Sequence, residues 1–175
     1  MAQDPTRVYF FSGPVMPERA FDCIRFLLDC DSRNHKEITI YIDSPGGNIV
    51  DGLAVADTMN LIKSPVRTIC LGLAASMGSI LLCSGEKGRR AALPNSRIMI
   101  HQPLQPNGVY GTYHDMREAA DGLTYCRDVL EQIIAKASGQ PLEKVHEDCG
   151  HDNYLTAPEA LEYGLIDEII ETVNR

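Results

Sequence analysis

Segments with the composition of β-strands alternate with segments of helical apolar spacing through the amino-terminal part of the chain. The strand-like segments are rich in β-branched and aromatic residues and cover 7–13, 37–43, 66–72 and 96–101. Helical stretches lie between them at 18–30, about 48–62 and about 75–84; the first repeats apolar residues at helical spacing, namely Phe21, Ile24, Leu27 and Leu28. Repeated strand and helix units predict an α/β fold in which helices cover a mostly parallel sheet.

The chain is expected to form a single domain, 1–175, because its 175 residues match the length of one domain and contain no linker or internal repeat. No apolar run approaches the ~18 residues that a membrane span needs. The amino-terminal segment MAQDPTRVYFF lacks the positive segment and the apolar core of a secretion signal. These features predict a cytoplasmic protein that does not act at a membrane.

Two further classes of function are disfavoured by composition. The six cysteines are scattered without a CxxC pair, which favours reduced core thiols over a disulfide framework or a metal site. The formal net charge of −8 would repel phosphate backbones, so nucleic acid is a poor candidate partner. We therefore expect neither a metal cofactor nor a nucleic-acid partner.

A long amphipathic helix is predicted over 112–138. Its apolar positions recur in alternating steps of three and four residues, and they are Met116, Ala119, Leu123, Cys126, Leu130, Ile133 and Ala137. Such a helix would extend about 40 Å, as far as a globule of this size is wide. It can project and pack on another subunit, or it can lie across its own sheet, and the periodicity leaves both arrangements open.

The segment LGLAASMGSI (71–80) gathers small residues where a packed core would use larger side chains. A strand ending at Gly72 and a helix beginning near Ala75 would place Ser76 in a first helical turn, where unpaired amides favour a developing anion. Serine needs a base to become a nucleophile, and His101 in the segment MIHQP offers one. Small residues also suit tight packing between a strand and a helix, so the segment alone supports either interpretation.

The segment SPGG (44–47) provides a second candidate element of an active site. Pro45 restricts its own φ, while Gly46 and Gly47 permit positive φ and leave their amide groups accessible. Such a turn can present N–H donors to an oxyanion. Many loops contain PGG for reasons of geometry alone, so this segment by itself predicts only a turn.

In combination, these motifs resemble the ClpP family, which comprises the proteolytic subunits of the Clp protease. The resemblance covers nearly the whole chain from about Arg7. The matching segments are YIDSPGGNIVDGLAVADTM, TICLGLAASMGSILLCSGEKGRR, LPNSRIMIHQPL and YLTAPEALEYGLIDEII. It implies a serine endopeptidase with a ClpP/crotonase-like α/β fold.

The resemblance also implies the roles of individual residues. It places the nucleophile at Ser76 and the general base at His101. The acid falls on Asp152 of HDNYLTAPEA, and Asp148, four residues earlier, is the nearest alternative. The reaction implied is acyl transfer, in which the serine attacks a peptide carbonyl and water later hydrolyses the acyl-enzyme.

The oxyanion hole implied by the resemblance consists of the backbone amides of Gly47 and Met77. Members of the family act without a metal or another cofactor, on peptides and unfolded proteins. They form homo-oligomers, two stacked heptameric rings that enclose the active sites, and a handle between the rings would correspond to about 104–138. A Clp AAA+ ATPase normally delivers the substrate, and a second ClpP-like subunit can join the rings.

The resemblance further implies a pocket in which the ATPase partner docks. Tyr41 and Leu61 would supply apolar surface to this pocket. Ala91 stands where the family usually has an aromatic residue, so the pocket would have a smaller apolar wall here. We therefore expect weak docking of a Clp-type ATPase.

Two alternatives from other functional classes remain open. A crotonase-fold acyl-CoA enzyme would also use glycine amides around a thioester oxyanion, but it would not need Ser76 and His101 together. A structural ring subunit of a mixed Clp barrel would resemble the family while lacking members of the triad, and here all three residue types are present.

Overall fold

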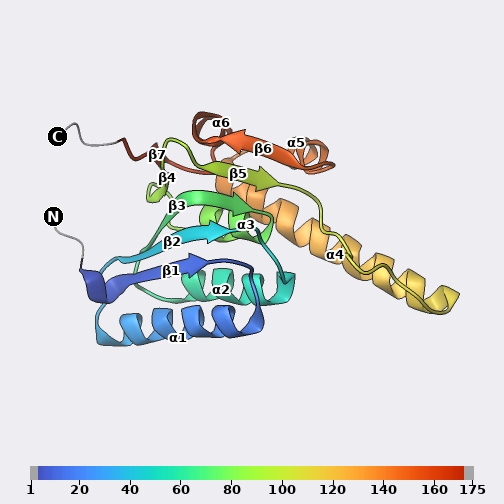
Figure 1. Ribbon diagram of the computed structural model, residues 1–175, viewed down its shortest axis with the longest axis horizontal. Helices are drawn as coiled ribbons and strands as arrows, with labels where there is room; N and C mark the ends of the chain where they lie inside the picture. Colours follow the sequence, from blue (N-terminus) through green and yellow to red (C-terminus); the bar gives the residue numbers. More distant parts are fainter. Residues whose placement is uncertain (1–3, 172–175) are drawn as a thin grey trace.

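The computed structural model describes residues 4–171, which form a seven-stranded, mostly parallel sheet with helices packed on it (Figure 1). The strands follow the order β1-β2-β3-β4-β7, and β5 pairs with both β3 and β6. Within this part of the chain β5 and β6 form the one antiparallel pair. The bounds are β1 Val8–Ser12, β2 Ile38–Ser44, β3 Val66–Ala75, β4 Arg90–Ala92, β5 Arg97–Ile100, β6 Asn153–Thr156 and β7 Glu168–Ile169. The predicted α/β fold is confirmed.

Strand β3 divides the sheet because its two halves have different partners. Residues 68–70 pair with β4, and residues 73–75 pair with β5. The sequence predicted that this strand would end at Gly72, whereas β3 continues to Ala75. The small residues at its end therefore lie within a paired strand, because β5 provides the hydrogen-bonding partner that the local sequence could not reveal.

Six α-helices are present in residues 4–171, with one short 3-10 helix, η1 Pro5–Arg7, at the start. Their bounds are α1 Pro17–Arg33, α2 Ile49–Leu61, α3 Met77–Cys83, α4 Tyr113–Ser138, α5 Leu142–Asp148 and α6 Ala157–Tyr163. The predicted helices 18–30, 48–62 and 75–84 correspond to α1, α2 and α3. Figure 1 shows α1 and α2 together along one side of the β1–β2–β3 part of the sheet.

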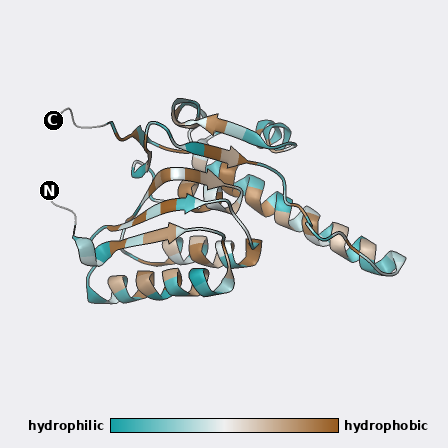
Figure 2. Cartoon of the chain, viewed as in Figure 1, coloured by the Kyte–Doolittle hydropathy of each residue, from teal (hydrophilic) through white to brown (hydrophobic). Residues whose placement is uncertain are grey.

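Helix α1 packs on the sheet through small side chains. Its buried positions recur at helical spacing and are Ala20, Cys23, Leu27 and Cys30. Phe21 and Leu28, which contributed to the predicted apolar pattern, are exposed. Figure 2 shows the resulting alternation of apolar and polar segments along this helix. Alanine and cysteine let the helix approach its neighbours closely, while Leu27 is fully buried and Phe26 packs against the edge of the core.

Helix α4 projects beyond the sheet, as its course in Figure 1 shows. Thr112 forms a capping box with Asp115 at its beginning, and the helix ends at Gly139, whose φ is 78°. Its buried residues all lie near its carboxyl end and are Leu130, Glu131 and Ile134. Of the two arrangements left open by the sequence, the structure therefore has the projecting helix.

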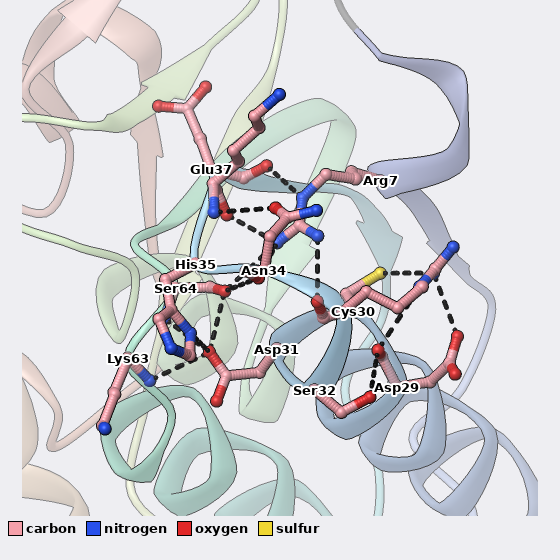
Figure 3. Close-up of polar contacts among 12 residues, drawn as sticks. Arg7, Asp29, Cys30, Asp31, Ser32, Asn34, His35, Glu37, Lys63 and Ser64 are labelled. Atoms are coloured by element: carbon pink, nitrogen blue, oxygen red, sulfur yellow. Dashed lines mark hydrogen bonds and ion pairs between the residues drawn. The ribbon is translucent and has the colours of Figure 1, made fainter.

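A buried arginine fastens the beginning of the sheet (Figure 3). The guanidinium of Arg7 donates hydrogen bonds to the carbonyl oxygens of Cys30, Glu37 and Lys36 at 2.9, 3.0 and 2.6 Å. It also donates to Ser64 Oγ at 3.1 Å. Only 4% of Arg7 is exposed. One side chain thus joins the start of β1 to the end of α1, the start of β2 and the loop that precedes β3.

Asp31 lies beside this arginine cluster and holds the same loop (Figure 3). Its Oδ1 accepts hydrogen bonds from Lys63 N at 3.2 Å, Ser64 N at 2.8 Å and Ser64 Oγ at 2.8 Å, and it lies 3.0 Å from His35 Nδ1. Partial burial would raise the pKa of this carboxyl. The hydrogen bonds from Ser64 and His35 outweigh that effect and lower the pKa from 3.8 to about 2.

This lowered pKa predicts how the stability of the chain depends on pH. Because the folded-state pKa lies below the ordinary value, the stabilisation is complete above pH 3.8 and is lost as the pH falls toward 2. We expect Asp31→Asn to lower the urea midpoint of unfolding at pH 7, and the difference from wild type to vanish near pH 2. Asp29→Asn, which breaks only an exposed pair with Arg33, is the control and should change the midpoint little. A difference that persists unchanged at low pH would contradict the prediction.

Candidate active site

Ser76 lies at the sharp junction between β3 and α3. Its φ of 55° and ψ of −124° place it in the left-handed half of backbone space, and it is the one non-glycine residue with positive φ in the described part of the chain. Such a conformation costs about 1–3 kcal/mol and persists only where neighbouring contacts impose it. Ser76 N donates to Met99 O at 2.9 Å, and Ser76 O accepts from Ser79 N at 2.9 Å. The sequence predicted Ser76 within the first turn, and the structure places it just before the helix.

A chain of two hydrogen bonds joins the three residues predicted to form a triad. His101 Nε2 lies 2.8 Å from Ser76 Oγ, and His101 Nδ1 lies 3.0 Å from Asp152 Oδ1. His101 follows the end of β5 and Asp152 precedes the start of β6, so pairing of these two strands brings the base and the acid together. The imidazole is 12% exposed and the carboxylate is 61% exposed. This geometry suits transfer of the serine proton to the imidazole.

The alternative acid, Asp148, lies elsewhere. It is the last residue of α5, and its Oδ2 accepts hydrogen bonds from Lys144 Nζ at 2.7 Å and Tyr163 Oη at 2.8 Å. Burial, together with the bond to Asp148, raises the pKa of the Tyr163 hydroxyl. Asp148 therefore fastens α5 to α6, and the carboxylate in contact with His101 is that of Asp152.

The SPGG turn lies directly against the serine. Gly46 and Gly47 have φ values of 93° and 149°. A Cβ on Gly46 would lie 2.6 Å from Ser76 Cβ and 3.0 Å from Met77 N, and a Cβ on Gly47 would lie 2.3 Å from Val15 O. Glycine is required at both positions, because each combines a left-handed backbone with a neighbour too close for any side chain. The turn thus packs against Ser76 and Met77 through Gly46, and Gly47 and Met77, the candidate oxyanion donors, line one cavity.

A cavity of about 650 Å³ opens beside Ser76 and His101. Its lining includes Gly47 and Met77 and is otherwise mostly apolar. The apolar residues include Val50, Met99, Leu104, Leu130 and Ile134. The base of α4 thus forms one wall, and the loop that leads to α4 forms another. A cavity of this kind can accept an apolar side chain next to the carbonyl that Ser76 would attack.

The three residues predicted for ATPase docking have different environments. Tyr41 in β2 stacks on Phe10 with ring centroids 5.1 Å apart, and Leu61 at the end of α2 is 78% exposed. Ala91 is 0% exposed, and its methyl group forms no part of the surface of this chain. It lies in the sheet between Ile69 of β3 and Glu168 of β7, which explains its burial. The assignment of Tyr41, Leu61 and Ala91 to a docking pocket stays a prediction.

None of the six cysteines lines the cavity beside Ser76 and His101. All of them are unpaired, and burial raises the pKa of Cys23, Cys83 and Cys149 to about 12. These three thiols are therefore uncharged and weakly nucleophilic near neutral pH. Across residues 4–171 no three histidine, cysteine or acidic side chains gather as a metal site would require. The same residues contain no helix long and apolar enough to cross a membrane.

Gln102 is a residue near the site that the sequence interpretation missed. Its backbone N–H donates to Cys149 O at 2.6 Å, and its side-chain Nε2 donates to Gly150 O at 2.8 Å. It directly follows His101, and both acceptors shortly precede Asp152 in the chain. The quoted motif MIHQP contains this glutamine, but its partners come from a distant segment that local sequence does not indicate.

Comparison with known proteins adds independent evidence. A family model described as Clp protease matches residues 4–173. A protein named ATP-dependent Clp protease proteolytic subunit from Streptococcus salivarius is 49% identical over 165 residues, covering 94% of this chain and 84% of the relative. A protein of the same name from Streptococcus thermophilus is 49% identical over 165 residues, with the same coverage of 94% and 84%.

Proposed function

The chain belongs to the Clp protease family and is a serine peptidase of the proteolytic-subunit type, and from this premise we propose that Ser76, His101 and Asp152 are its catalytic triad. The observation that supports the proposal most directly is the chain of hydrogen bonds from Asp152 through His101 to Ser76, at 3.0 and 2.8 Å. Family membership sets aside the acyl-CoA enzyme. The assembled triad argues against a structural subunit without activity.

The proposed reaction begins with the Ser76 hydroxyl. His101 Nε2 takes the hydroxyl proton as Ser76 Oγ bonds to the carbonyl carbon of the peptide. Asp152 Oδ1 accepts a hydrogen bond from His101 Nδ1–H, which fixes the tautomer in which Nε2 is free to accept a proton. The C–N bond then breaks as His101 gives its proton to the departing amine. His101 then takes a proton from a water molecule as the water oxygen bonds to the acyl carbon. The bond from this carbon to Ser76 Oγ breaks, and His101 returns the proton to restore the Ser76 hydroxyl.

The negative charge that develops on the carbonyl oxygen must be stabilised by hydrogen-bond donors. We assign this role to the backbone N–H groups of Gly47 and Met77, which line the same cavity as Ser76 and His101. Backbone hydrogen bonds from Ser76 N to Met99 O and from Asn48 N to Val15 O, each 2.9 Å, hold the two turns in position before substrate arrives. Such preorganised donors stabilise the transition state without having to reorganise during the reaction.

The proposed assembly follows from the family and from the projecting helix. We propose a cytoplasmic homo-oligomer of two stacked heptameric rings that degrades peptides and unfolded proteins, with α4 and the preceding loop as the handle. Tyr113, Met116 and Tyr125 on α4 are 70%, 51% and 70% exposed, as expected of a helix that packs on another subunit. The relatives are named subunits of an ATP-dependent protease, so a Clp-type ATPase is the proposed partner. Mixed rings that also contain a second ClpP-like subunit type are the alternative to this homo-oligomer.

Covalent labelling tests the proposed function directly. A fluorophosphonate should add once per chain, and peptide mapping by mass spectrometry should locate the adduct on Ser76, because among residues 4–171 this is the one hydroxyl with a hydrogen bond to His101. The same preparation should hydrolyse a short fluorogenic peptide with an apolar residue before the cleaved bond. Labelling elsewhere, or hydrolysis that continues after complete labelling, would refute the assignment.

A further inference from the structure

The carboxylate of Asp152 makes few contacts that could fix its orientation. It is 61% exposed, and within residues 4–171 its one hydrogen-bond partner is the imidazole of His101. Its orientation must therefore depend on the backbone that leads into and out of it. That backbone runs from the end of α5 at Asp148 through Gly150 to the start of β6 at Asn153.

The pairing of β5 with β6 explains why this backbone needs support. Ile100 is opposite Asn153, so the same antiparallel register would place His101 opposite Asp152 and Gln102 opposite His151. Instead Gln102 N binds Cys149 O, two positions earlier in the chain than that register predicts. The ladder therefore ends at Ile100 and Asn153, and residues 150–152, which carry Asp152, bulge away from it as the loop between α5 and β6.

The side chain of Gln102 closes the base of the bulge. Its Nε2 donates to Gly150 O at 2.8 Å, next to the backbone bond at 2.6 Å from Gln102 N to Cys149 O. Both hydrogen bonds are donated by the residue that directly follows His101. Gln102 therefore links the chain next to the general base to the segment that carries the acid, Asp152. Gly150 also donates from its own N–H to Glu147 O at 3.1 Å, which ties the bulge to α5 on its other side.

We propose that Gln102 is a positioning residue, whose side-chain amide holds the 150–152 bulge so that Asp152 remains aligned with His101 Nδ1. The inference rests on the proposed triad and extends it to a residue with no role in the proposed reaction. Gln102 contacts neither the serine nor the imidazole through any hydrogen bond in the described residues, so it acts only through the acid. Without the amide, the bulge keeps the backbone bond but loses the second bond that fixes its orientation.

Removing the amide donor should slow the reaction without weakening substrate binding. Gln102→Met and Gln102→Ala both remove the donor but leave different side-chain volumes, so an equal loss in both identifies the hydrogen bond as the cause. We expect kcat for a short peptide to fall about 10-fold to 100-fold with KM nearly unchanged, because a small misalignment of a catalytic group lowers the rate strongly. Gln140→Ala is the matched control, since Gln140 Nε2 donates to Tyr163 O at 3.1 Å away from the triad.

A double variant tests whether Gln102 acts through Asp152. In the Asp152→Asn background, Gln102→Met should have almost no further effect on kcat, because the alignment it maintains is already lost. A purely structural role would instead multiply the two losses, and that result would overturn the proposal. Wild-type kcat in both Gln102 variants, or an equal loss in Gln140→Ala, would also overturn it while leaving the triad in place. If Asp152→Asn itself keeps the wild-type rate, both the proposed triad and this inference are wrong.

Discussion

Ser76→Ala should lower peptide hydrolysis on the order of 10⁶-fold, the size of loss expected when a triad nucleophile is removed. The serine Oγ lies 2.8 Å from His101 Nε2, and alanine leaves no atom there that can bond to the carbonyl carbon. The residual rate should come only from the oxyanion donors and from substrate binding. The measurement is hydrolysis of a fluorogenic peptide at high enzyme concentration, with the oligomeric state checked by sedimentation.

Ser84→Ala provides the control for this loss. Ser84 follows the end of α3, and its backbone N donates to Ile80 O at 3.0 Å without any contact to the triad. The variant should keep the activity of the wild type. Activity in Ser76→Ala that exceeds the expected residual rate, with normal assembly, would show that another residue forms the acyl-enzyme.

Asp152→Asn should lower turnover by about 10⁴-fold. An asparagine amide would donate its hydrogen to His101 Nδ1, which forces the imidazole into the tautomer whose Nε2 already has a proton. Such an imidazole cannot take the proton of Ser76. Because the side-chain shape is preserved, KM for a short peptide should change little, and steady-state kinetics separates the two effects.

Asp148→Asn is the matched control for the acid. This change alters bonds to Lys144 and Tyr163, which lie at the packing of α5 on α6 and not at His101. We expect a lower unfolding temperature with near-normal turnover. A large loss of turnover in Asp148→Asn together with a harmless Asp152→Asn would transfer the acid role to Asp148.

The general architecture could be predicted from sequence because its determinants are local. β-Branched and aromatic residues identify the strands, helical apolar spacing identifies α1 and α4, and the glycines of SPGG identify the turn beside the serine. Recognition of the family then supplied Ser76, His101 and Asp152, which the structure brings into contact. Composition alone could not have done so, since any chain of this length contains several serines, histidines and aspartates.

The remaining features depend on contacts between distant segments. The extension of β3 to Ala75 requires β5 as a partner, and the burial of Ala91 requires strands on both sides of it. Helix α1 buries Cys23 and Leu27 and leaves Phe21 exposed, and this choice of face depends on the neighbouring elements. The 150–152 loop that Gln102 holds lies just beyond the end of the β5–β6 pairing, and its contact with Gln102 joins segments that are distant in the sequence.

The backbone at Ser76 places stability and activity in conflict. A glycine there would adopt the observed φ of 55° without strain, so the folded chain would gain stability while losing the hydroxyl that reacts. Random mutagenesis followed by a screen for heat resistance alone would therefore enrich inactive chains at this position. Directed evolution of a more heat-stable enzyme from this sequence therefore needs a catalytic assay in every round. The residue with the strained backbone is also the proposed nucleophile.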